Sequence, residues 1–160
     1  LDDTSHKIAV AAIKYGMLNQ DSNKNIVFSM EDWLVSEGDT GTYLVYAYVR
    51  IRSIGRKISR EVRPDVDFSL LKHPNEKKLL RQMLDFNETV FNAGEQFRPS
   101  MLARMLFEFS KDFSRAYNTC SVMHAEHEQL QCARLLLFHC VAETLQQGLN
   151  LLGITPPERM

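Results

Sequence analysis

The stretch from residue 38 to residue 57 constrains the fold of this chain more than any other. Gly38, Asp39 and Thr40 are residues typical of a turn and a helix N-cap, and the next twenty residues contain no proline. At about 100° per residue, one stripe of this segment is aliphatic. Its members are Leu44, Ala47, Ile51, Ile54 and Ile58. We therefore predict a helix over about 40–60 that turns this stripe toward a hydrophobic core.

A second stripe of the same helix is aromatic and basic, and it contains no acid. Its members are Tyr43, Tyr46, Arg50 and Lys57. Rings and cations arranged in this way can stack on nucleobases and pair with phosphates. The alternative is an ordinary amphipathic helix whose tyrosines border the core and whose cations are solvated. Spacing alone favours that alternative.

The overall charge hides a local basic patch. The 160 residues carry a formal net charge of −1, so a polyanionic partner has to meet a local cluster of cations. Such a cluster occurs within 41–60, where no acid accompanies the basic residues. They are Arg50, Arg52, Arg56, Lys57 and Arg60.

Length and composition fit one globular domain with a real core. Hydrophobic residues make up 44% of the chain, and no apolar run approaches the roughly 18 residues of a membrane span. The acidic, polar start lacks a secretory leader pattern, and the first residue, Leu1, indicates an excised fragment. The odd cysteine count indicates a reducing compartment.

Hydrophobic periodicity predicts helices through the rest of the chain. We expect long helices over 2–18, 40–60, 75–94, 99–117 and 128–147. Gly16 and Gly94 are predicted to end two of them and Gly148 to end or distort a third, with a linker over 61–74. A β-branched and aromatic run at 26–28 is expected to be extended, and a short helix is expected from Ser29 or Glu31 to Gly38. The predicted fold is all-α, an antiparallel helix bundle with a shorter N-terminal part.

Other candidate chemistry is weak. Cys120, His124, His127 and Cys132 are close in sequence, but their spacing matches no common zinc pattern. No phosphate-binding glycine loop and no evident catalytic triad occur, so a self-standing catalytic centre is not expected. Arg134 lies in an apolar stretch and has to find a partner or reach the surface.

Several motifs, in colinear order, resemble arginyl-tRNA synthetase, and most closely its eukaryotic cytosolic type. They are the sequence AIKY at 12–15, the dipeptide VF at 27–28, EDWL at 31–34, the run GDTGTYLVYAYVRIRSI at 38–54, and the ending LLGITPPERM at 151–160. The long central motif and the terminal motif make this resemblance specific.

The resemblance implies a class I aminoacyl-tRNA synthetase that joins arginine to its tRNA with ATP and magnesium. Residues 1–37 would be the end of the catalytic domain and residues 38–160 the helical anticodon-binding domain. The fragment itself is expected to hold no cofactor or metal and to be inactive alone. Its implied partners are the anticodon loop and stem of arginine tRNA and the rest of the catalytic domain, in the cytoplasm, with no membrane or DNA involved.

The family's functional positions carry over onto five residues here. The pattern Y-x-x-Y-x-x-x-R, which faces tRNA in the family, matches Tyr43, Tyr46 and Arg50. The aromatic residue at the end of the penultimate helix matches Tyr117, and the C-terminal methionine near the anticodon matches Met160. Lys57 joins them by geometry alone. The alternative function is a protein-interaction bundle that kept the fold and lost tRNA binding.

Overall fold

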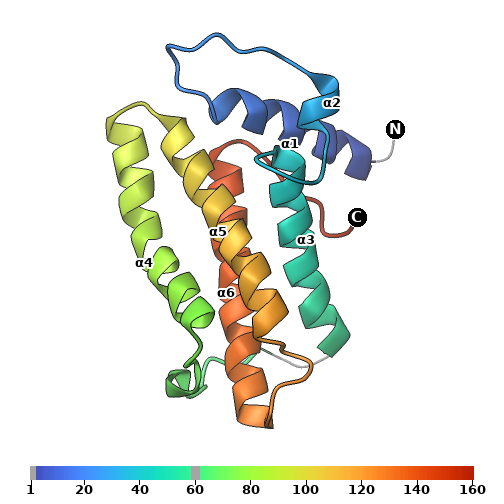
Figure 1. The fold of residues 1–160 in the computed structure, drawn as a ribbon, viewed down its shortest axis with the longest axis vertical. Helices are drawn as coiled ribbons and strands as arrows, with labels where there is room; N and C mark the ends of the chain where they lie inside the picture. Colours follow the sequence, from blue (N-terminus) through green and yellow to red (C-terminus); the bar gives the residue numbers. More distant parts are fainter. Residues whose placement is uncertain (1–2, 59–61) are drawn as a thin grey trace.

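Four long helices run alongside one another, and a further helix crosses one end of them (Figure 1). This computed structural model describes residues 3–58 and 62–160. Its elements are α1 (Asp3–Leu18), α2 (Met30–Trp33), α3 (Gly41–Ile58), the 3₁₀ helix η1 (Phe68–Leu70), α4 (Pro74–Glu95), α5 (Pro99–Thr119) and α6 (Glu128–Leu151). Within these described ranges there is no strand, which confirms the all-α prediction.

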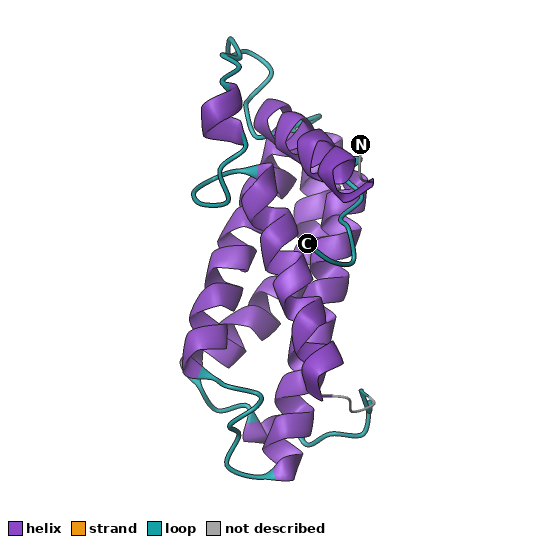
Figure 2. Ribbon diagram, turned by 90° about the vertical axis from the view of Figure 1, so that its right-hand side faces the viewer, coloured by secondary structure: helices purple, strands orange, loops and turns teal. Residues whose placement is uncertain are grey.

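The helices α3 and α5 run in one direction, and α4 and α6 run in the other (Figure 1). The side view in Figure 2 shows α1 lying across the end of the bundle where α3 begins. The predicted core stripe of α3 is confirmed, because Leu44, Ala47, Ile51 and Ile54 are buried. Ile58, the last member of the stripe, is partly buried against the same core. Leu44, Ile51 and Ile54 belong to a core cluster with large side chains from the other helices, which include Tyr15, Phe109, Phe113, Phe138, Leu145 and Leu149.

Side-chain caps explain where several helices begin. Thr40, rather than Asp39, caps α3, because its Oγ1 accepts a hydrogen bond from the Tyr43 backbone N–H at 3.1 Å. Asp39 instead accepts from the Tyr15 hydroxyl at 2.5 Å and from the Asn19 side-chain amide at 2.8 Å. The start of α3 is therefore tied to α1 by the residue next to its cap.

The three glycines predicted to end or distort helices lie inside them instead. Gly16 precedes the end of α1 at Leu18, Gly94 precedes the end of α4, and Gly148 lies within α6. Packing explains two of these errors, because the Leu106 side chain occupies the space beside Gly148 and the Trp33 ring occupies the space beside Gly16.

The segment between α1 and α2 is exposed, whereas part of the C-terminal tail is buried. The run at 26–28 has irregular backbone, and its side chains are exposed. In the C-terminal tail, Pro156 and Pro157 are buried, and the three residues after them are exposed. The predicted cation Arg60 and the predicted helix start at Asp2 lie outside the described residues. None of the described helices is both long and apolar enough to cross a membrane.

Candidate nucleic-acid interface

Two members of the aromatic and basic stripe of α3, Tyr43 and Arg50, contact α5. The Tyr43 hydroxyl lies 3.2 Å from Ser114 Oγ, and the Tyr43 ring meets the Phe107 ring nearly edge-on with centroids 5.8 Å apart. Both partners belong to α5, so Tyr43 fixes how the two helices share this surface. We call this surface the α3/α5 face; it consists of Tyr43, Tyr46, Arg50, Phe107, Lys111, Ser114 and Tyr117.

Arg50 and Tyr117 form the second contact between the two helices. The guanidinium carbon of Arg50 lies 3.9 Å from the centroid of the Tyr117 ring, which is a close cation–π stack. Within the described part of the chain, the Arg50 guanidinium makes no hydrogen bond and no ion pair. Its N–H donors are therefore available to an acceptor from outside, such as a phosphate oxygen.

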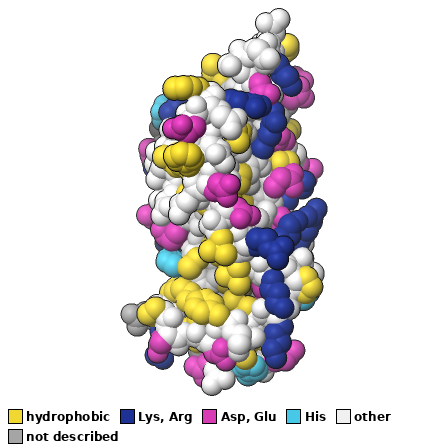
Figure 3. Space-filling view, turned by 90° about the vertical axis from the view of Figure 1, so that its left-hand side faces the viewer, with side chains coloured by type: hydrophobic (Ala, Val, Ile, Leu, Met, Phe, Trp, Pro, Cys, Tyr) yellow, Lys and Arg dark blue, Asp and Glu magenta, His cyan; other side chains and the backbone are white. Residues whose placement is uncertain are grey.

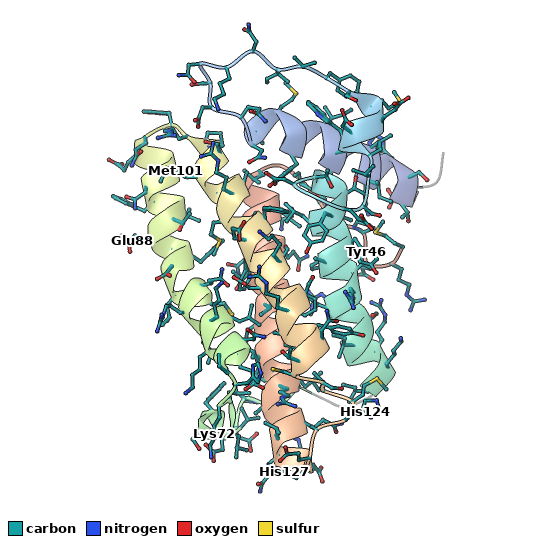
Figure 4. The ribbon with its side chains drawn as sticks, in the orientation of Figure 1. Tyr46, Lys72, Glu88, Met101, His124 and His127 are labelled. Atoms are coloured by element: carbon teal, nitrogen blue, oxygen red, sulfur yellow. The ribbon has the colours of Figure 1, made fainter. Side chains whose placement is uncertain are left out.

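The structure brings some of the predicted site residues together and not others. Tyr43, Arg50 and Tyr117 share the α3/α5 face, and Tyr46 projects from α3 with 45% of its surface exposed (Figure 4). Lys57 and Met160 are exposed, and among the described residues no hydrogen bond, ion pair or ring contact joins either of them to the other four. The tail that carries Met160 is held where Arg56 Nη1 donates to the Glu158 carbonyl at 3.1 Å.

Apart from Tyr117, the α5 residues of this surface were missed from the sequence. Lys111 Nζ lies 5.0 Å from the Phe107 ring centroid, so a second cation–ring pair stands beside the first. Phe107, Lys111 and Ser114 follow one another at helical spacing on α5, off its apolar stripe. That pattern, an aromatic residue followed by a lysine one turn later, is the signal from which they could have been found.

One cation of the predicted basic patch is used inside the bundle. Arg52 donates to Glu143 Oε1 at 2.7 Å and to Gln146 Oε1 at 3.0 Å, both on α6. No acid accompanies this patch within 41–60, but an acid from another helix, Glu143, pairs with Arg52. Arg56 donates to the Glu158 carbonyl, so among the predicted cations that the structure describes, Arg50 and Lys57 are the ones left for an external partner.

The candidate zinc ligands do not form a cluster. His127 caps α6, because its Nδ1 accepts from the Leu130 backbone N–H at 3.2 Å. Cys120 is buried, and burial raises the pKa of its thiol, which disfavours the thiolate that zinc binds. In residues 3–58 and 62–160, no group of three or more histidine, cysteine, aspartate or glutamate side chains is placed to hold a metal ion.

A comparison with protein families identifies the domain. The model of the DALR anticodon binding domain matches residues 44–160, which is most of the chain. The chain belongs to the DALR anticodon-binding domain family. The match includes α4, α5, α6 and all of α3 except its first three residues, so it covers the α3/α5 face apart from Tyr43.

Relatives of this DALR domain are arginine–tRNA ligases. The arginine–tRNA ligase of Bdellovibrio bacteriovorus is 39% identical over 154 residues, which cover 96% of this chain and 27% of that protein. The structure of the Thermus thermophilus arginyl-tRNA synthetase superposes with a TM-score of 0.90 at 35% identity, over 98% of this chain and 27% of that one. The synthetase of Plasmodium falciparum gives a TM-score of 0.87 at 29% identity, over 98% of this chain and 28% of that one.

The chain therefore spans about a quarter of the length of the relatives that it matches. The resemblance to arginyl-tRNA synthetase inferred from the sequence motifs is confirmed at the level of the family. The closer resemblance to the eukaryotic cytosolic type stays a prediction.

Proposed function

We propose that this DALR domain binds the anticodon loop and stem of arginine tRNA as part of an arginine–tRNA ligase. The observation that supports this most is the stack of Arg50 on Tyr117, which stands beside Tyr43 and Tyr46 on one face. Unpaired bases of an RNA loop stack on aromatic rings and on guanidinium planes, and the backbone phosphates pair with cations. The α3/α5 face offers both kinds of group side by side.

The proposed roles differ from residue to residue. Tyr46 and Tyr117 would supply rings for bases, and Arg50 would donate to a phosphate or a base edge next to them. Tyr43 is half-buried, and we assign it two roles. It fixes the position of α3 against α5, and the exposed edge of its ring contacts the RNA. Lys57 and Met160 would extend the contact beyond the face, Lys57 to a phosphate and Met160 to the anticodon.

The rest of the proposed enzyme would surround this domain. We assign residues 1–37 to the end of a catalytic domain and residues 38–160 to the anticodon-binding domain. Exposed apolar side chains on α1, on α2 and in the segments before and after α2 support this, because they fit a surface covered by further protein. They are Ile13, Met17, Ile26, Val27, Phe28, Met30, Leu34 and Val35. The catalytic domain would supply ATP and magnesium binding and ligation of arginine, in the cytoplasm.

Tyr117→Ala and Arg50→Ala test the proposed interface. Loss of one base–aromatic stack is worth about 1–3 kcal/mol, so we expect each variant to bind arginine tRNA roughly 5- to 150-fold more weakly. Binding of an arginine tRNA transcript to the 160-residue chain, measured by fluorescence anisotropy at fixed salt, provides the readout.

Phe91→Ala is the matched control, because Phe91 is an aromatic residue that is 65% exposed on α4, outside the α3/α5 face. We expect it to leave tRNA binding unchanged. Equal affinity of Tyr117→Ala, Arg50→Ala and the unaltered chain would contradict the proposed interface. Absence of measurable tRNA binding by the unaltered chain would instead favour the alternative, a helical module that binds protein and not tRNA.

A further inference from the structure

A buried carboxylate lies on the flank of α5 that faces away from α3. The Asp112 side chain is 3% exposed and accepts three hydrogen bonds. The donors are Lys78 Nζ at 2.9 Å and Gln82 Nε2 at 3.0 Å, both on α4, and Arg115 Nη1 at 2.7 Å on the next turn of α5. One carboxylate therefore binds two cations, one from each helix, and the three side chains together keep a net charge of +1.

These cations remain accessible to a partner. The Lys78 side chain is 51% exposed and that of Arg115 is 56% exposed, so each presents its remaining donors to solvent. Arg81 follows Lys78 by one helical turn and is also exposed. We call Lys78, Arg81 and Arg115 the α4/α5 ridge. Figure 3 shows Lys and Arg side chains gathered in a column along one edge of the face that carries α4.

Lys111 connects this ridge to the α3/α5 face. At about 100° per residue, Lys111 lies on the outer crest of α5, between Ser114 on the α3 side and Arg115 on the α4 side. Its ammonium group stands over the Phe107 ring and pairs with Glu108 on the surface. A partner that lies across α5 would therefore meet rings on one side and cations on the other.

We infer that the α4/α5 ridge binds backbone phosphates of the RNA whose bases reach the α3/α5 face, and that Asp112 is the positioning residue of that ridge. This inference rests on the proposed function and adds to it a second contact surface. RNA fits because its backbone presents anions beside bases, and this surface places cations beside rings. Asp112 holds two long side chains in one orientation, which reduces the conformational freedom that they would lose on binding.

The variant Arg81→Gln/Arg115→Gln tests the ridge. It leaves Asp112 paired with Lys78 and Gln82, so the buried carboxylate keeps its partners and the fold is expected to persist. The measurement is the affinity of the 160-residue chain for an arginine tRNA transcript across a series of salt concentrations. Two lost phosphate contacts are expected to lower the salt-dependence slope by about 1.4–1.8 in magnitude.

Lys7→Gln/Lys24→Gln is the charge-matched control, because these lysines lie on α1 and in the connection after it. We expect its slope to equal that of the unaltered chain. If the salt-dependence slope of Arg81→Gln/Arg115→Gln is unchanged while Tyr117→Ala still binds tRNA weakly, the ridge does not bind phosphates. The proposed function would then still hold. If the slope of Arg81→Gln/Arg115→Gln and the affinity of Tyr117→Ala both equalled those of the unaltered chain, the ridge and the proposed function would both be overturned. That result would point to an acidic protein as the partner of these cations.

Asp112→Asn tests the positioning role separately. If Asp112 contributed only its negative charge, its removal would tighten RNA binding, since the surface becomes more positive. If it positions Lys78 and Arg115, binding weakens several-fold although the net charge has risen. Tighter binding would overturn the positioning role. The test of the ridge itself does not depend on this variant, because Arg81→Gln/Arg115→Gln leaves Asp112 in place.

Discussion

Arg134→Leu is expected to destabilise the protein by about 3–5 kcal/mol, because it leaves a buried carboxylate without its counter-charge. Glu76 is only 1% exposed, and its Oε1 lies 2.6 Å from Arg134 Nε. Arg134 also donates through Nη1 to the Ser121 carbonyl at 2.9 Å. Urea denaturation of the unaltered chain and the variant at neutral pH gives the difference in free energy of unfolding.

The effect is expected to be large because Glu76 connects several elements at once. Its second oxygen accepts from the His73 backbone N–H at 2.9 Å, and His73 in turn caps α4 through its Nδ1. Losing Arg134 therefore disturbs the start of α4, its contact with α6 and the loop that contains Ser121. That loop follows α5 directly, a few residues after Tyr117.

Two further variants distinguish the cost of leaving Glu76 without its counter-charge from the cost of removing an arginine side chain. Arg115→Leu removes a half-exposed arginine whose partner Asp112 keeps other donors, so we expect a loss below about 1 kcal/mol. Glu76→Leu/Arg134→Leu removes both charges and is expected to recover most of the stability lost in Arg134→Leu. A loss below about 1 kcal/mol for Arg134→Leu would mean that this pair is not buried as described.

Hydrophobic periodicity predicts the five long helices to within a few residues, because each has to cover one side of its length with apolar side chains. The errors concern glycines. A glycine inside a helix costs about 1 kcal/mol relative to alanine, so the sequence favours a helix end there. At Gly16 and Gly148 the side chains of Trp33 and Leu106 pack into the space that the glycine leaves. Such contacts come from residues distant in the sequence, and local patterns do not contain them.

The candidate site also has a part that is predictable from one helix and a part that depends on how the helices pack. The sequence of α3 alone predicts Tyr43, Tyr46 and Arg50 on one stripe, since they belong to one helix. Tyr117 is predicted through the family resemblance, but its contact with Arg50, and the roles of Phe107 and Ser114, become visible only when α3 and α5 are packed. The need of Arg134 for a partner is likewise predicted from its apolar surroundings, but its partner, Glu76, lies on another helix and is known only from the fold.

Gly41→Ala is the second substitution expected to have a large effect, because α1 and α3 meet backbone to backbone at this glycine. A Cβ atom at Gly41 would overlap the carbonyl oxygen of Ala11, lie 2.6 Å from its carbonyl carbon and lie 2.8 Å from Tyr15 Cβ. A backbone group cannot rotate away as a flexible side chain can, so α1 has to move off α3. We expect a loss of about 3 kcal/mol, the upper end of the usual range for overpacking.

The matched control for Gly41→Ala lies in the same helix. A Cβ at Gly55 would have no described atom within 4 Å, so Gly55→Ala is expected to stabilise the protein by up to about 1 kcal/mol through helix propensity. Hydrogen exchange locates the damage: amides of α1 should lose protection in Gly41→Ala, while those of α4 and α6 keep more of theirs. Tyr15 also donates to Asp39 beside the α3 cap. Movement of α1 away from α3 would therefore also break this contact between residues 1–37 and the bundle. Equal stability of the two alanine variants would show that α1 does not approach α3 this closely.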